Sequence, residues 1–193
     1  MVLTNAAAWA WPWRVLNSKT MERNRQAPQR SLITGVAGSG KSTLEKEFKQ
    51  RGYITIDIDD GYAEWRHAVT NELLLYTPNE PGWHEVAEWV VETDKLQAFF
   101  DANASHPVYV FGSFARMSRV VGLFDTIYLL KYRDEAMVRE RIAGREGGYG
   151  KHKSELERIL SYIQPYQTKM QKYGAVAIDC GLPIEQIAKV IIG

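Results

Sequence analysis

The feature that most constrains this chain is the stretch "GVAGSGKST" at residues 35–43, which fits the template G-x-x-x-x-G-K-[ST]. Its three glycines let the backbone curl so that successive N–H groups point inward, and such a concave loop binds phosphate oxygens. The apolar run at residues 31–34 is an expected strand, and an amphipathic helical pattern follows the loop. The positive end of that helix would face the same anion. This combination predicts a site for the phosphates of a nucleotide.

Individual positions in the stretch have distinct expected roles. Lys41 would reach the β- and γ-phosphates, and the hydroxyl of Ser42 would ligate Mg²⁺. The glycines and the polar residues beside them would surround the same phosphates. We therefore predict that the nucleotide is bound by Gly35, Gly38, Ser39, Gly40, Lys41, Ser42 and Thr43.

The rest of the chain alternates short β-rich runs with helical patterns, which is typical of a parallel sheet covered by helices on both faces. The expected strands are residues 31–34, 53–57, 108–112, 126–130 and 175–179. The expected helices are residues 42–52, 85–103, 134–146 and 154–174, followed by a last helix that begins at Pro183. We also expect an Asp134 cap, a Ser154–Glu157 capping box and a kink at Pro165. The predicted fold is a three-layer α/β domain.

Two carboxylates follow the second expected strand, in "YITIDIDDGY". Asp57 closes an apolar run one strand after the loop, where it would hold Mg²⁺ in part through water. Asp59 would point into the same cleft and accept a proton from an attacking hydroxyl. The alternative is a simple turn, because Asp-Asp-Gly favours turns, and we take that interpretation for Asp60. Asp179 also ends an expected strand, and we interpret it as structural.

The segment "VRERIAGREGGYGKHK" at residues 138–153 combines arginines with a glycine-rich loop. Arg141 and Arg145 are four residues apart and would share one helix face. Arginines that close over a γ-phosphate stabilise its transition-state charge, and a hinged loop excludes water. We therefore predict a short lid at residues 139–153, with a solvated basic helix face as the alternative. A GTPase would need a guanine-reading N-K-x-D, which the chain lacks.

These motifs resemble those of the small P-loop kinases, such as adenylate, shikimate and gluconate kinase. "GVAGSGKST" is similar to their phosphate loop, "RIAGR" at residues 141–145 to the adenylate kinase lid, and "DID" at residues 57–59 to the D-x-D of shikimate kinase. The resemblance implies ATP as the donor and a P-loop fold with a parallel five-stranded sheet of order 2-3-1-4-5. It also implies that Arg141 stacks on the adenine, that Arg145 contacts the transferred phosphate and that Asp59 contacts the acceptor hydroxyl.

Residues 31–193 as a whole also resemble a group of poorly characterised bacterial kinase-like ATPases. The shared features are a D-x-D–G-[FY]-x-x-W segment at residues 57–65, a short lid ending in "[FY]GK" and a closing "IDxxxPxxxI". The chain departs from adenylate kinase because its lid is short and lacks zinc cysteines. It departs from shikimate kinase because "FGSFARMSR" stands where that family has a triple glycine. The resemblance therefore does not identify the molecule that accepts the phosphoryl group.

Residues 61–105 lie where these kinases carry the acceptor-binding segment, and they are rich in aromatic side chains. Aromatic walls suit a sugar ring or a base, although such residues also form the core of a small helical insert. We expect Trp89 to be core, on the apolar stripe of its helix, and Trp65 and Trp83 to contact the acceptor. Arg116 would either grip an anionic group of the acceptor or be a surface charge.

The composition excludes several function classes. The net charge of +1 argues against bulk attraction to nucleic acid or an anionic membrane, and no apolar run reaches the roughly 18 residues of a membrane span. A single cysteine, Cys180, favours a reducing cytoplasm, and neither His67 nor His84 has a partner at metal spacing. Residues 1–30 are expected to be a flexible leader, or else a Trp/Arg surface arm, ahead of one domain at residues 31–193.

The sequence thus predicts a cytoplasmic phosphotransferase that moves the γ-phosphate of Mg-ATP to a hydroxyl of a small metabolite or nucleoside. The expected catalytic residues are Lys41, Asp59 and Arg145. Three alternatives stay open: a nucleoside monophosphate kinase, a nucleic-acid end kinase, and an ATP-binding regulatory module with slow hydrolysis. The sequence indicates neither the acceptor nor the oligomeric state.

Overall fold

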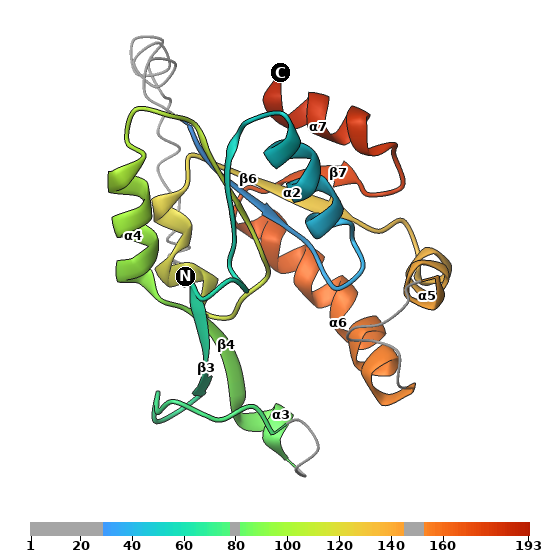
Figure 1. Ribbon diagram of the computed structural model, residues 1–193. Helices are drawn as coiled ribbons and strands as arrows, with labels where there is room; N and C mark the ends of the chain where they lie inside the picture. The colour runs from blue at the N-terminus through green and yellow to red at the C-terminus, as the bar shows by residue number, and fades with distance from the viewer. Residues whose placement is uncertain (1–28, 78–81, 145–152) are drawn as a thin grey trace, which may run out of the picture.

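The computed structural model describes residues 29–77, 82–144 and 153–193. Its centre is a sheet of five strands: β1 (Arg30–Thr34), β2 (Ile54–Asp57), β5 (Val108–Phe111), β6 (Thr126–Lys131) and β7 (Val176–Asp179). They lie in the order β2-β5-β1-β6-β7, and every neighbouring pair is parallel (Figure 1). Counted along the chain within this sheet, the order is 2-3-1-4-5, which confirms the expected topology.

The apolar runs of the sequence form the inside of this sheet. Leu32 and Ile33 of β1, Val110 and Phe111 of β5, and Leu129 of β6 are fully buried. Successive residues of a strand point to opposite faces, so burial of consecutive residues requires cover on both faces. The runs therefore need helices on each side of the sheet.

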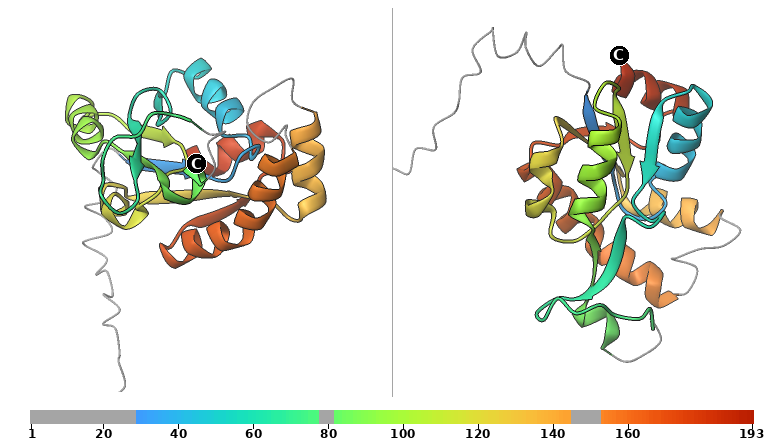
Figure 2. Two further views of the ribbon diagram at one scale, coloured as in Figure 1. Left: turned by 90° about the horizontal axis from the view of Figure 1, so that it is seen from below. Right: turned by 60° about the vertical axis from the view of Figure 1, so that its left-hand side comes forward.

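The described part of the chain has five helices of eight or more residues: α2 (Lys41–Gln50), α4 (Thr93–Ala102), α5 (Glu135–Ala143), α6 (Lys153–Lys172) and α7 (Ile184–Ile192). Helices α2 and α7 lie against each other, and α2 and α6 lie on opposite sides of the sheet (Figure 2). Two short 3₁₀ helices, η1 (Met117–Arg119) and η2 (Val121–Leu123), follow β5. Among the described residues, no helix has the length and apolarity needed to cross a bilayer.

Local signals in the sequence explain several helix ends. The Oδ1 of Asp134 accepts a hydrogen bond of 2.9 Å from the N–H of Met137, as expected for a cap of α5. Pro183 directly precedes α7, where its fixed φ suits a helix start. Pro165 lies inside α6, which continues to Lys172. The side chain of Ser154 is outside the described residues, so the expected capping box stays a prediction.

The segment between β2 and β5 differs from the single helix expected at residues 85–103. Residues Trp83–Val86 form a short helix, α3, but residues Ala87–Val91 form a strand, β4, before α4 begins. Strand β4 pairs antiparallel with β3 (Ala63–His67), and the pair projects from the main sheet (Figure 1). The helical interpretation of residues 87–91 was wrong. The apolar residues there have a near-helical spacing, but the same residues, "AEWVV", are also rich in β-forming types, and they form a strand because β3 pairs with them.

Candidate active site

The loop between β1 and α2 needs glycine at the positions where the sequence has it. Gly38 and Gly40 have φ of 80° and 98°, in the left-handed region that side chains disfavour. A Cβ on Gly38 would lie 2.7 Å from the hydroxyl of Tyr132, and a Cβ on Gly35 would lie 2.8 Å from the carbonyl oxygen of Leu130. Leu130 of β6 and Tyr132, which follows that strand, therefore pack against the loop.

The start of α2 places backbone N–H groups beside the loop. The first helical hydrogen bond runs from the N–H of Leu44 to the carbonyl of Gly40, at 2.9 Å. The N–H groups of residues 41–43 therefore have no acceptor within the helix, which is the arrangement that binds an anion. Ser42 and Thr43 are exposed and line the cleft described below, whereas the Ser39 side chain is buried under the loop.

Lys41 lies over the loop that it follows. Its Nζ donates hydrogen bonds to the carbonyl oxygens of Gly35 at 2.7 Å and Val36 at 3.3 Å. The hydroxyl of Ser113, in the loop after β5, also donates to the Gly35 carbonyl. The ammonium group is thus held at the concave side of the loop by acceptors that a phosphate could replace.

The two carboxylates of the D-x-D segment stand beside the loop at the end of β2. Asp57 is half-buried, and its Oδ1 accepts a 3.1 Å hydrogen bond from the N–H of Asp59. Burial raises the pKa of Asp57 above its ordinary value, and the neighbouring charge of Asp59 adds to that shift. The Asp59 side chain is exposed, and its Oδ1 accepts a 2.8 Å hydrogen bond from the indole N–H of Trp89. Asp60 lies in the exposed turn, as expected.

Gly112 explains how β2 and β5 approach each other at this edge. A Cβ on Gly112 would lie 2.8 Å from the Cβ of Ile58, and the N–H of Ile58 donates to the Phe111 carbonyl at 2.8 Å. A side chain at position 112 would push the D-x-D segment away from the sheet. Gly112 thus permits the close approach of the two segments at this edge.

One cleft of about 1350 Å³ joins these parts. Because the strands are parallel, their carboxyl ends meet at one edge of the sheet, where the phosphate loop and the D-x-D segment are neighbours. Residues of α6, of α7 and of the β3–β4 hairpin complete the lining. The predicted site residues that line it are Gly38, Ser39, Gly40, Lys41, Ser42, Thr43, Asp57, Asp59, Trp65 and Arg141.

Arg141 lies beside the phosphate loop, on the side opposite β2, the strand that ends at Asp57. Its guanidinium donates to the carbonyl oxygen of Ser39 at 3.4 Å and to that of Cys180, after β7. The thiol of Cys180 is buried, and burial raises its pKa to about 11, so it remains neutral at physiological pH. Arg145 and the rest of the expected lid through residue 152 lie outside the described residues.

Aromatic side chains of the β3–β4 hairpin form one wall of the cleft. Trp65 and Trp89 are directly opposed across the two strands, and their ring centroids lie 5.0 Å apart. Tyr76 stacks on Trp65 at 5.7 Å. We call Trp65, Tyr76 and Trp89 the aromatic wall, since all three line the cleft. Trp83 is buried behind the wall, 4.7 Å from Trp65, and its indole N–H donates to the Leu75 carbonyl.

Two sequence interpretations change here. Trp89 was expected to be helix core, but it is a strand residue that lines the cleft and bonds to Asp59. Trp83 was expected to contact the acceptor, but it does not line the cleft and supports Trp65 instead. The signal that could have found Trp89 is the matched pair of segments "AEWRH" and "AEWVV", which predicts paired strands with their tryptophans opposed.

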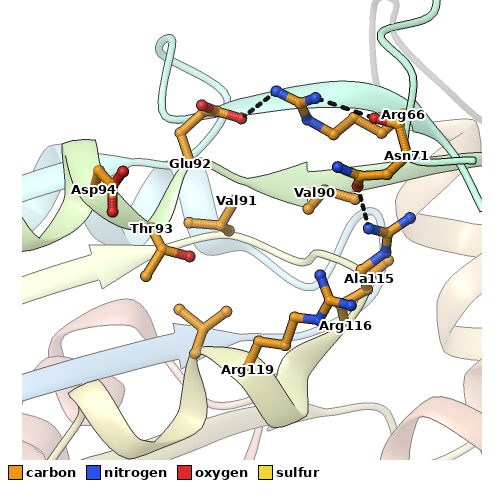
Figure 3. Close-up of a pocket in the computed structure, with 11 residues that line it drawn as sticks. Arg66, Asn71, Val90, Val91, Glu92, Thr93, Asp94, Ala115, Arg116 and Arg119 are labelled. Atoms are coloured by element: carbon orange, nitrogen blue, oxygen red, sulfur yellow. Dashed lines mark hydrogen bonds and ion pairs between the residues drawn. The ribbon is translucent and has the colours of Figure 1, made fainter.

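Arg116 also differs from the expected roles. It lines a separate cavity of about 300 Å³ on the hairpin (Figure 3). Its guanidinium donates to the carboxylate of Glu88 at 2.7 Å, to the Asn71 side chain and to the carbonyls of His67 and Ala68. Arg116 therefore does not lie where it would bind an anionic group of the acceptor, and it is not a free surface charge. Arg116 braces the hairpin against the loop after β5.

Two histidines, His67 and His84, belong to the segment between β2 and β5, and neither has a partner at metal spacing in the sequence. The Nδ1 of His67 accepts hydrogen bonds from the N–H groups of Val69 at 3.3 Å and Thr70 at 3.2 Å. This pattern closes a turn at the end of β3. The side chain of His84 lies outside the described residues.

The donor set of the cleft fits Mg²⁺. The hydroxyl of Ser42 and the carboxylate of Asp57 are both oxygen ligands, and both residues line the same cleft. Mg²⁺ is usually held by one or two protein oxygens, with phosphates and water completing its shell. Among the described residues, no cluster of three or more His, Cys, Asp or Glu residues suited to a metal occurs.

Comparison with known proteins gives the fold. No family model matches the chain, and no curated protein matches its sequence. The shikimate kinase from Acinetobacter baumannii, solved in complex with shikimate, superposes with a TM-score of 0.54 and 14% identity over 88% of this chain and 94% of that chain. The shikimate kinase from Bacteroides thetaiotaomicron gives 0.51 and 18%, over 84% and 96%. The chain therefore has the fold of the small P-loop kinases, as the motifs implied.

Proposed function

We propose that this protein transfers the γ-phosphoryl group of Mg-ATP to a hydroxyl group of a small metabolite or nucleoside. The observation that carries the proposal is the single cleft in which a phosphate loop, a carboxylate and an aromatic wall meet. A loop alone would also serve a nucleotide-binding regulator. The carboxylate of Asp59, open to the cleft and fixed by Trp89, is the group that an acceptor hydroxyl requires.

The residues divide the reaction between them. The loop and Lys41 bind the phosphates, and Ser42 with Asp57 would hold Mg²⁺, which neutralises charge on the β- and γ-phosphates when bound. The acceptor oxygen bonds to the γ-phosphorus as the bond to the bridging oxygen of ADP breaks, and Asp59 accepts the hydroxyl proton. Arg141, which donates to the carbonyl oxygens of Ser39 and Cys180, is proposed to stack on the adenine, and Arg145 is proposed to stabilise the transferring phosphate.

We also propose that the protein is cytoplasmic. ATP is the proposed donor, and the only cysteine, Cys180, is a buried free thiol in the structure. Both features suit a reducing cytoplasm. The shared fold with two shikimate kinases supports phosphoryl transfer in general and does not identify the acceptor.

The test is ADP release from Mg-ATP in the presence of pooled acceptors, with Lys41→Ala as the control. The pools are nucleosides, nucleoside monophosphates and small hydroxylated metabolites. We expect one pool to stimulate release, and Lys41→Ala to reduce that rate by at least about 100-fold, the loss typical of one preorganised charge donor. Asp59→Asn should lower the rate about 100-fold or more while ATP still binds. Release that no acceptor stimulates would favour the regulatory module.

A further inference from the structure

We infer that the acceptor is an uncharged, ring-bearing alcohol, such as a sugar or nucleoside without phosphate or carboxylate groups. The inference rests on the proposed function and names the acceptor class that this function leaves open. It concerns the part of the cleft lined by the aromatic wall together with Glu88, which we call the acceptor subsite.

The aromatic wall starts at the proposed base and extends away from it. The indole N–H of Trp89 bonds to Asp59 at 2.8 Å, and Trp65 lies 5.0 Å from Trp89. Tyr76 then stacks on Trp65 with an angle of 18° between the ring planes. Trp83 packs behind Trp65 and fixes its position. Preformed ring faces of this kind bind the apolar face of a sugar or a base at low entropic cost.

The charged side chains in and beside the acceptor subsite, Glu88 and Asp59, are both carboxylates. Glu88 uses its Oε2 to accept from Arg116, and its Oε1 has no hydrogen-bond partner in the described part of the chain. Trp89 donates to the Oδ1 of Asp59, and the Oδ2 of Asp59 likewise has no hydrogen-bond partner among the described residues. Such oxygens accept hydrogen bonds from hydroxyl groups, whereas they repel a phosphate or a carboxylate.

Three of the cations near the cleft, Lys41, Arg141 and Arg116, are hydrogen-bonded outside the acceptor subsite or to Glu88. Lys41 and Arg141 contact carbonyls of the phosphate loop, at the donor end. Arg116 does not line the cleft, and its donors are bound within the hairpin. Among the described residues, the other cation in the lining is Arg158, which is exposed on α6. Within the described ranges, the acceptor subsite thus has no buried, unpaired cation that would compensate an anion for lost hydration.

The experiment compares acceptors in pairs that differ only in charge. ADP release by the full chain with Mg-ATP is measured with nucleosides against their 5′-monophosphates, and with sugars and cyclitols against their acids and phosphates. We expect the best acceptor to be an uncharged member, with kcat/KM at least about tenfold above that of its anionic partner. The two series distinguish a nucleoside from a sugar.

Three variants test whether the acceptor subsite causes the preference. Trp65→Leu removes the ring face and should raise the KM of the acceptor about tenfold, with the KM of ATP unchanged. Tyr62→Leu is the matched control, since Tyr62 packs on Phe99 and does not line the cleft. Glu88→Gln removes charge with little change in size. It should lower the ratio of uncharged to anionic kcat/KM several-fold.

The outcomes separate this inference from the function on which it rests. Preference for an anionic acceptor, with Lys41-dependent turnover, overturns the inference and leaves the proposed function standing. A preference for uncharged acceptors that Trp65→Leu and Glu88→Gln both leave intact also overturns the assignment to this subsite. If Lys41→Ala makes no difference to ADP release, the proposed function fails first, and the inference fails with it.

Discussion

At the scale of single residues, Asp57 and Asp59 are two carboxylates that differ in their exposure to water. Asp57 is half-buried at the end of β2, and desolvation raises its pKa above 3.8. The folded state then binds this proton more tightly than the unfolded state. The free energy of unfolding therefore falls as pH rises from the unfolded pKa through the folded pKa, and the ionised Asp57 costs stability above both.

For this reason we predict that Asp57→Asn does not lower the free energy of unfolding at about pH 7, where the charge it removes is unfavourable. The new amide oxygen can still accept from the N–H of Asp59. The difference between variant and wild type should shrink as the pH is lowered to about 4, and urea denaturation at both pH values measures it. Mg-dependent ADP release should fall sharply at the same time. A variant that is much less stable but fully active would contradict both roles.

Trp89 should act on the rate through its hydrogen bond to Asp59. Trp89→Phe keeps an aromatic ring in the aromatic wall but removes the indole N–H that fixes the carboxylate. We predict that kcat falls by about tenfold to 100-fold, the value of a hydrogen bond to a charged group, with little change in the KM of the acceptor. Steady-state kinetics separate the two constants. Trp65→Phe is the control, because Trp65 has no bond to Asp59, and an equal loss of kcat there would contradict the positioning role.

At the scale of elements, the β3–β4 hairpin carries the aromatic wall, and Arg116 holds the hairpin in place. Arg116→Met removes the bonds to Glu88, Asn71 and two backbone carbonyls. We predict faster amide hydrogen exchange at residues 63–67 and 87–91 and a raised KM for the acceptor, because the wall is less fixed. ATP affinity should not change. The matched variant is Arg119→Met, since Arg119 is exposed in the same segment, and equal exchange in both variants would exclude the brace.

The same hairpin shows where prediction from sequence reached its limit. The parallel strands could be predicted because each is an apolar run whose burial depends on local composition. Strand β4 was missed because residues 87–91 also match a helical spacing, and only the comparison of "AEWVV" with the distant segment "AEWRH" indicates their pairing with β3. The roles of Trp83 and Arg116 depended on the same pairing. Both residues sit beside the cleft only through contacts with residues distant in the chain.

At the scale of the whole molecule, the sequence predicted the proposed ATP-binding part of the site (the donor half) better than the part proposed to bind the phosphoryl acceptor (the acceptor half). The phosphate loop and its helix are contiguous at residues 35–50, so their geometry follows from local rules. Asp57 and Asp59 could be assigned to the same site because the carboxyl ends of parallel strands meet at one edge of the sheet. The acceptor subsite is assembled from β3, β4 and the turn carrying Tyr76. Its composition follows from tertiary contacts that no short motif records.

The division into donor and acceptor halves has a thermodynamic consequence for the entire fold. A ligand that binds only the folded state stabilises it by RT ln(1 + [L]/Kd), or about 2.7 kcal/mol at 100 times Kd. For a chain of this length we therefore predict that saturating Mg-ATP raises the Tm by about 5–10 °C. Lys41→Ala should abolish most of this shift, and Trp65→Leu should preserve it, because the aromatic wall belongs to the acceptor half. Thermal denaturation with and without Mg-ATP checks all three proteins. A shift lost in Trp65→Leu would mean that the nucleotide, and not the acceptor, lies on the wall.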